Sequence, residues 1–98
     1  IAFAASFHVR HAIISIGALD AGFGPSDSYL AEAEFARMVL SRGENRIIIS
    51  DSSKFGRTAL IKVCDFKDIT RLISDGIPDA KLSAALQEAG VNVNVVAP

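Results

Sequence analysis

A short polar segment, Ser50 to Arg57, carries the side chains of this sequence best suited to hold a small anionic or sugar-like molecule. Its first five residues, Ser50-Asp51-Ser52-Ser53-Lys54, place a carboxylate, hydroxyls and an ammonium close together. Hydroxyls and backbone N–H groups suit sugar and phosphate oxygens, and lysine binds a phosphate as a point charge. Arg57 can add a second cation. Because polar turns with a solvated lysine are common, the spacing alone leaves an ordinary turn and a ligand contact both open.

Two carboxylates elsewhere in the chain are weaker candidates for the same kind of site. Glu34 falls about 60° from the centre of the apolar stripe of a predicted helix, so it borders the predicted buried face. It is either a site carboxylate facing a crevice or an ordinary flanking residue. Asp20 lies in a glycine-rich stretch, where it is either a turn residue or a ligand contact.

Other kinds of chemistry find little support in the sequence. His8 and His11 are three residues apart with no cysteine or acidic residue beside them, so no metal site is predicted. The single cysteine, Cys64, cannot form an internal disulfide, fits a reducing compartment and is interpreted as a small core residue. No Walker loop, G-x-G-x-x-G fingerprint or Ser-His-Asp order is present, so neither a cofactor nor a covalent mechanism is expected.

Length and charge limit the possible classes further. The 98 residues allow one domain with a modest core. The net charge of −1, with 10 scattered basic residues, argues against this segment binding nucleic acid by itself. No apolar run approaches the roughly 20 residues that span a bilayer. The apolar start, Ile1 to Phe7, lacks a basic lead-in and a full hydrophobic region, so we expect a piece of a longer cytoplasmic polypeptide and not a signal peptide.

Strand and helix patterns alternate along the chain. The apolar, β-branched runs Ala12–Ile16 and Ile47–Ser50 are typical of strands buried on both faces. Shorter strands are predicted at Ala59–Val63 and Ile69–Ile73. The strict alternation of Val91–Val95 predicts a last strand with one covered and one wetter face.

Two helices separate these strands, and Asp20–Ser28 is predicted to be a loop. The first helix is expected from about Ser28 to Ser41, with Gly43 as its stop. The second begins near Pro78 and ends at Gly90. Each should bury one apolar stripe: Ala31, Phe35, Met38 and Val39 in the first, and Leu82, Ala85, Leu86 and Ala89 in the second.

Buried strands separated by helices predict an α/β fold, Rossmann-like, with a mostly parallel sheet flanked by helices. Ligands of such sheets bind beyond the carboxyl ends of the strands. Two polar segments, Gly17–Ser28 and Ser50–Arg57, are predicted to lie there.

The second of these segments resembles a known family. Ile47 to Arg57 closely resembles the D-x-S-K-F-G-R signature of DeoR-family regulators. Ala31 to Arg37 is similar to that family's E-A-E helix, Asp68 to Asp75 to its I-D-x-L-I-T-D strand, and Leu82 to Val96 to its closing helix and strand. The similarity runs from about His11 to the end of the chain, and the signature is its most specific part.

The resemblance implies a part in transcription regulation and carbohydrate metabolism. Members are bacterial repressors with an N-terminal winged helix-turn-helix and a C-terminal sensor that resembles ribose-5-phosphate isomerase. The sensor binds a phosphorylated sugar or glycerol phosphate, which alters DNA binding, and it usually self-associates. Residues 1–98 would then be a partial effector-binding domain, a non-enzyme that contacts DNA only through a helix-turn-helix outside this chain.

The family motifs match individual positions of this sequence. Lys54 matches the signature lysine and is the best candidate for a ligand contact, while Asp51 matches the aspartate that opens the signature. Glu34 matches the helix carboxylate that faces the sugar site. Nearer the start of the chain, Leu19 departs from the polar residue usual after the first strand. The remaining predicted ligand-binding residues are Ser52, Ser53, Arg57, Gly17 and Asp20.

Two other functions remain open at this level. A sugar-phosphate isomerase on the same fold would need a general base such as Glu34, but the isomerase D-G-A-D-E loop is only faintly echoed by Gly17-Ala18-Leu19-Asp20. A pure oligomerisation module would expose apolar surface to other copies of the chain.

Overall fold

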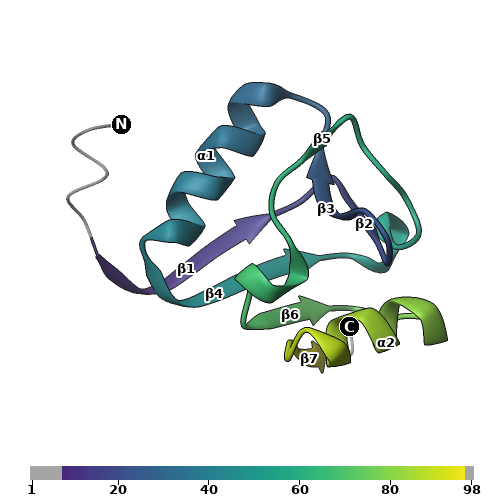
Figure 1. Cartoon of the computed structure of the whole chain (residues 1–98). Coiled ribbons are helices and arrows are strands. Elements are labelled where there is room, and N and C mark those ends of the chain that lie inside the picture. The colour runs from purple at the N-terminus through teal and green to yellow at the C-terminus, as the bar shows by residue number, and fades with distance from the viewer. Residues whose placement is uncertain (1–7, 97–98) are drawn as a thin grey trace.

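A four-stranded parallel sheet forms the centre of the computed structural model, which describes residues 8–96 (Figure 1). Its strands are β1 (Val9–Ser15), β4 (Gly43–Ser50), β6 (Arg71–Ser74) and β7 (Asn92–Val95). They lie in the order β1-β4-β6-β7, and every neighbouring pair is parallel. This confirms the predicted α/β fold with a parallel sheet.

Both helices, α1 (Leu30–Ser41) and α2 (Ala80–Glu88), pack on the same face of this sheet. Because the strands add in chain order and such crossovers are right-handed, each connection returns over that face. Ile48, Leu72 and Leu86 are fully removed from solvent there. Each such side chain contributes roughly 1.5–3 kcal/mol by burial.

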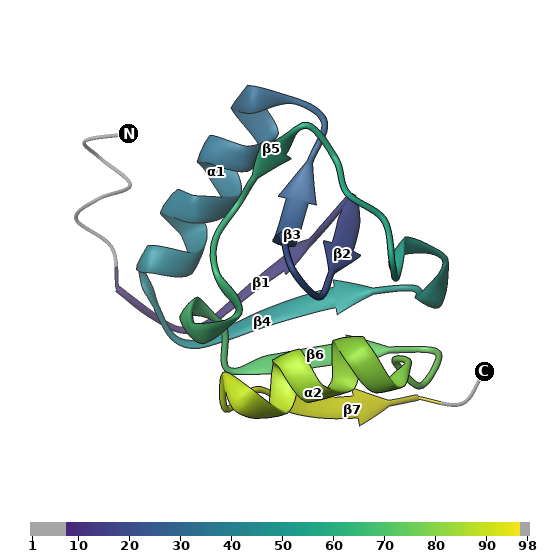
Figure 2. The same ribbon diagram turned by 45° about the vertical axis from the view of Figure 1, so that its right-hand side comes forward.

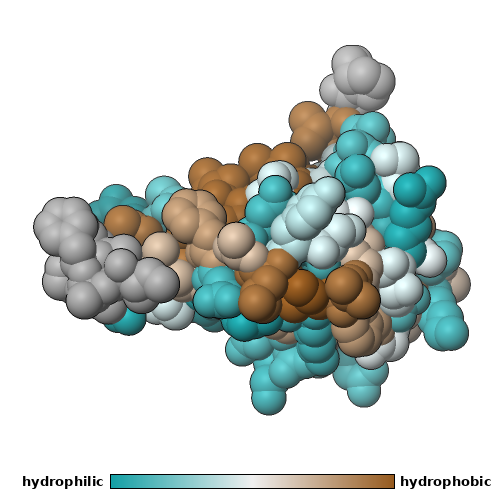
Figure 3. All heavy atoms as spheres, turned by 90° about the horizontal axis from the view of Figure 1, so that it is seen from above, coloured by the Kyte–Doolittle hydropathy of each residue, from teal (hydrophilic) through white to brown (hydrophobic). Residues whose placement is uncertain are grey.

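The α1 helix turns a different stripe toward the sheet from the one predicted. Its buried residues are Ala33, Ala36 and Leu40, whereas Phe35 is 63% exposed and Ala31 is also exposed. Both sets recur at helical spacing, so periodicity could not decide between them. The two alanines let the helix approach the sheet closely. Figure 3, which views the molecule from above, shows hydrophobic atoms exposed in several patches.

The expectation that the first two strands are buried on both faces is also wrong for the described residues. On the face opposite the helices, Ile13 is 54% and Ile49 is 46% exposed, although Ile47 is nearly buried. The reason is the one-sided crossover path, which leaves no helix of residues 8–96 to cover that face. The edge strand β7 likewise exposes all four of its residues, so Val93 and Val95 lack the cover that their alternation predicted.

The stretch predicted as a loop, Asp20–Ser28, instead contributes to a small second sheet. In this sheet β2 (Ala18–Asp20), β3 (Gly24–Asp27) and β5 (Ile61–Lys62) pair antiparallel. Gly24 has a left-handed backbone, φ +84°, and a Cβ there would lie 3.1 Å from the carbonyl oxygen of Cys64. Figures 1 and 2 both place β2 and β3 between α1 and the turn that follows β4.

The C-terminal half follows the predicted order closely. A short η3 turn (Phe66–Asp68) precedes β6, and the Asp79 carboxylate caps α2 by accepting a hydrogen bond from the Leu82 amide at 2.9 Å. Gly90, with φ +79°, lies just beyond the end of α2, as predicted. Among residues 8–96, no helix has the length and apolar character needed to span a membrane.

Candidate functional site

The polar segment after β4 forms a short 3₁₀ turn, η2 (Ser52–Lys54), whose shape is set by Asp51. One carboxylate oxygen of Asp51 accepts hydrogen bonds from both the amide of Ser53, at 3.0 Å, and the Ser53 hydroxyl. These two bonds lower the pKa of Asp51, and the charges of Lys54 and Arg57 act in the same direction. Asp51 is therefore first of all the cap that holds this turn.

The next two residues attach the turn to the rest of the molecule. Phe55 is half-buried against the hydrophobic core and pairs with Leu19 in an isolated parallel bridge. The amide of Gly56 donates to the carbonyl oxygen of Leu19 at 2.8 Å. Gly56 adopts a left-handed backbone, φ +76°, which favours glycine at this position. Phe55 and Gly56 of the signature thus attach the turn to the core and to the segment after β1.

The cations of the segment are left available. Lys54 is partly exposed and Arg57 is exposed, and neither forms a salt bridge within residues 8–96. The rest of the segment is bound to the backbone or the core, so Lys54 stands on a fixed turn. A fixed lysine with nearby hydroxyls and backbone amides can bind a phosphate or another anion.

A hollow of about 240 Å³ lies beside this turn, at the carboxyl ends of β4 and β6. Ser50 and Ser74, which face each other in register, are both buried next to it. Asp51 and Asp75 follow these serines and also line the hollow. The Asp75 carboxylate accepts a hydrogen bond from the amide of Ser52 at 2.7 Å. Sequence reasoning missed Asp75, although its position directly after a parallel strand was a usable signal.

The segment after β1 adjoins the turn that carries the family signature, Asp51–Arg57, as expected; this turn is called the signature turn below. The bond from Gly56 to Leu19 joins the two segments, which confirms that they lie side by side. A Cβ at Gly17 would lie 2.9 Å from a carboxylate oxygen of Asp27, so a side chain there would make the Asp27 side chain move. Asp20 closes its own turn by accepting bonds from the amides of Gly22 and Phe23, at 3.0 and 2.8 Å. Its role as a ligand contact stays a prediction.

Glu34 lies elsewhere in the molecule. It is exposed on α1, in a hollow that it shares with Leu30, Ala31, Phe35 and Met38. The expectation that it borders the buried face is wrong, because α1 turns another stripe inward. Since β2 and β3 lie between α1 and η2 in both ribbon views, the structure does not bring Glu34 to Lys54 (Figures 1 and 2).

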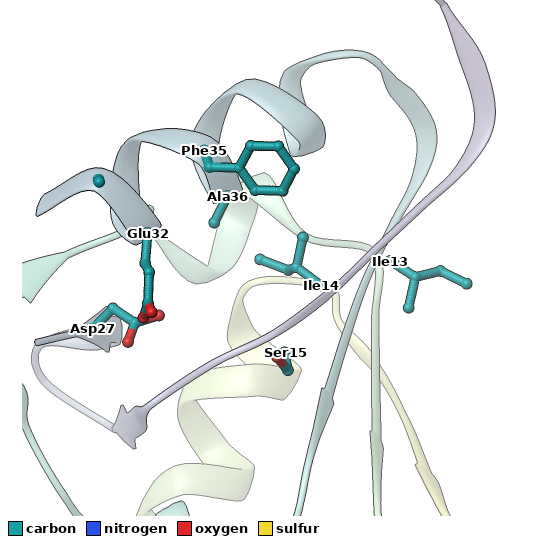
Figure 4. Close-up of a pocket in the computed structure, with 8 residues that line it drawn as sticks. Ile13, Ile14, Ser15, Asp27, Glu32, Phe35 and Ala36 are labelled. Carbon is teal, nitrogen blue, oxygen red and sulfur yellow. The ribbon is translucent and has the colours of Figure 1, made fainter. Parts of the chain in front are cut away.

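A larger hollow of about 520 Å³ lies between α1 and the edge strand β1. Figure 4 shows the carboxylates of Asp27 and Glu32 pointing toward each other at one end of it, with Phe35 and Ile14 further along. Its lining contains no lysine or arginine. Two carboxylates repel an anion, so this hollow does not suit a phosphate.

The remaining reactive residues offer no further site chemistry. Burial, followed by the charges of Asp68 and Asp65, raises the pKa of Cys64 to about 12. A protonated thiol is a poor nucleophile. His8 lies 3.3 Å from Glu44, whereas His11 contacts Asn45. No group of three potential metal ligands occurs within residues 8–96.

The structure is thus an α/β domain in which a capped, lysine-bearing turn lies at the carboxyl edge of a parallel sheet. The model of the DeoR C-terminal sensor domain matches residues 1–76. The chain therefore belongs to the family of DeoR C-terminal sensor domains, as its signature predicted.

Several transcription regulators resemble this chain. The HTH-type transcriptional regulator YulB of Bacillus subtilis is 30% identical over 93% of the chain and 35% of its own length. A protein of Escherichia coli O157:H7 that carries the name aga operon transcriptional repressor is 35% identical over 93% of the chain and 34% of its own length. The glycerol-3-phosphate regulon repressor of Haemophilus influenzae is 25% identical over 79% of the chain and 30% of its own length. The chain thus spans about a third of the length of these curated relatives.

Proposed function

We propose that this chain is the effector-sensing part of a DeoR-family transcriptional repressor, and that Lys54 binds the phosphate of a sugar phosphate or glycerol phosphate. The observation that carries the proposal is the state of the signature turn. Its carboxylate, its aromatic ring and its glycine hold the backbone, while its lysine remains without an ion-pair partner in the described chain. A fixed backbone with a free cation suits an anionic ligand.

The effector class is supported by the relatives as well as by the turn. One relative is named as a repressor of the glycerol-3-phosphate regulon, and another as a repressor of the aga operon. Phosphorylated small molecules combine the anion that Lys54 can hold with hydroxyls that Ser52 and Ser53 can bond. The hollow of about 240 Å³ beside the turn is lined by Asp51 and Asp75 and by no lysine or arginine, so it suits an uncharged part of such a molecule and not its phosphate.

Regulation would require further parts of the protein. We propose that residues 1–98 are part of a C-terminal effector domain in a cytoplasmic protein, whose DNA contacts are made by a separate helix-turn-helix domain. Self-association through this domain would bring two DNA-binding domains together. The effector changes DNA affinity only if it binds one arrangement of the protein more tightly than the other.

A titration of the full-length protein tests this function. Glycerol 3-phosphate and a series of pentose and hexose phosphates are titrated in a calorimeter, and operator binding is measured with and without each compound. We expect at least one of them to bind and to change the affinity for the operator. If none binds and operator affinity stays constant, the proposal is wrong.

No observation favours the isomerase alternative. The general base considered for it, Glu34, lies on the exposed side of α1 and away from the signature turn. The relatives named above are transcription regulators. An aldose–ketose turnover assay on the same sugar phosphates should therefore give no product above background.

A further inference from the structure

The turn after β6 is hydrogen-bonded to the start of the signature turn. The amide of Ser52, the first residue of η2, donates to the Asp75 carboxylate at 2.7 Å across 23 residues of sequence. The amide of Ser53 is already taken by Asp51. The first N–H groups of a helical turn have no partner within it and need one from outside. Asp75 supplies that partner for Ser52, as Asp51 does for Ser53.

Gly76 brings the two turns into direct contact. A Cβ at this position would lie 2.8 Å from the Cβ and 3.1 Å from the hydroxyl oxygen of Ser52. The Gly76 backbone is not left-handed, so the constraint is space and not conformation. Its amide donates to the hydroxyl of Ser74 at 3.3 Å, which holds the β6 turn itself in place.

The position of Ser52 matters for the residues that follow it. Its carbonyl oxygen accepts the amide of Phe55 at 3.2 Å, while the amide of Lys54 donates to the Asp51 carbonyl oxygen at the same distance. A shift of Ser52 would therefore disturb the two bonds that close the turn and would change the direction of the Lys54 side chain.

We propose that Asp75 and Gly76 are positioning residues for the effector site, holding Ser52 so that Lys54 points at the ligand. The inference rests on the proposed function, since it assigns a role in the site that the signature turn forms. It extends that site to the β6–α2 connection. Neither residue needs to contact the effector for this role.

Two substitutions of Asp75 can separate a positioning role from an effect of its charge on the ligand. A carboxylate beside a phosphate site repels the ligand, so loss of the charge alone should tighten binding in both Asp75→Asn and Asp75→Ala. Positioning predicts that the two variants differ. The amide oxygen of Asn still accepts the Ser52 N–H, whereas Ala cannot.

The test uses the full-length protein, with glycerol 3-phosphate and the same series of pentose and hexose phosphates as probes. For Asp75→Ala we expect about tenfold weaker binding and at least tenfold faster hydrogen exchange at the Ser52 amide, because a hydrogen bond to a charged acceptor is lost. Asp75→Asn should bind as well as the wild type or more tightly. Thermal unfolding checks that each variant is folded.

A second pair of variants tests the contact made by Gly76. Gly76→Ala should weaken binding because its methyl group pushes against Ser52. In a Ser52→Gly background, where the opposing Cβ is gone, the same substitution should have less than half of that effect. This rescue would not follow from a general loss of stability.

The outcomes separate the two claims. If the wild type binds none of the probes, the proposed function fails, and the positioning role fails with it. If the wild type binds but Asp75→Ala binds equally well, or if Ala and Asn shift affinity alike, the positioning role alone is wrong.

Discussion

The signature turn and the hollow between α1 and β1 both collect polar side chains near strand ends, and they use them in opposite ways. In the turn, the Asp51 carboxylate accepts hydrogen bonds from the amide and hydroxyl of Ser53, and Lys54 has no ion-pair partner within residues 8–96. In the hollow, Asp27 and Glu32 face each other among apolar side chains with no cation in the lining (Figure 4).

Volume is not the reason for proposing the signature turn as the effector site. The hollow beside α1 is about 520 Å³, against about 240 Å³ for the hollow at the signature turn. We propose the signature turn because its backbone is held by internal bonds and its lysine has no ion-pair partner within residues 8–96.

The largest expected effect comes from removal of the free cation. Lys54→Ala in the full-length protein should weaken binding of glycerol 3-phosphate or another effector by about tenfold or more, because a charge-assisted bond is worth roughly 1.5–3 kcal/mol. Folding should be nearly unchanged, since the side chain is partly exposed. Calorimetric titration measures the change. Lys81→Ala, which alters an exposed lysine on α2, is the matched control and should bind like the wild type. An unchanged effector response in Lys54→Ala would remove Lys54 from the site.

A smaller effect is expected at the end of the signature turn, where Gly56 bonds to Leu19. Gly56→Ala forces a side chain into a left-handed backbone of φ +76° and should cost about 1–2 kcal/mol in free energy of unfolding. Urea denaturation followed by circular dichroism provides the measurement. Gly22→Ala is the control, because its Cβ would meet only ordinary contacts in a backbone that is not left-handed. Equal stability of the two variants would show that Gly56 is not held in this conformation.

The sequence allowed much of this region to be predicted, because the relevant signals are local. Apolar β-branched runs marked the strands, and the signature marked the turn at their carboxyl edge. The stripe that α1 buries could not be predicted from the sequence, because the helix carries two apolar stripes. The antiparallel pairing of β3 with β5 depends on segments more than 30 residues apart. The position of Asp75 after a predicted strand was a usable signal, but its bond to the Ser52 amide joins residues 23 apart and depends on the fold.

A titration difference should separate a carboxylate used as a cap from an ordinary one. The pKa of Asp51 is lowered from 3.8, first by the bond from the Ser53 hydroxyl and then by the Ser53 amide. Its ionised form therefore stabilises the native turn above pH 3.8, and this contribution is lost as pH falls through the lowered pKa. Carbon-detected NMR of the Asp51 carboxyl group should give a midpoint below 3.8 in the wild type. Ser53→Ala should raise that midpoint; an unmoved midpoint would contradict the cap.

The smallest effects are expected on α1. Glu32→Gln removes one of the paired carboxylates of the larger hollow, and Glu34→Gln removes the family's helix carboxylate from its exposed position. Because both lie away from Lys54 across β2 and β3, each variant should bind the effector within about twofold of the wild type. The same titration in the full-length protein measures both. If Glu34→Gln weakened binding as much as Lys54→Ala, the effector site would include the exposed face of α1, and the contrast between the two regions would no longer hold.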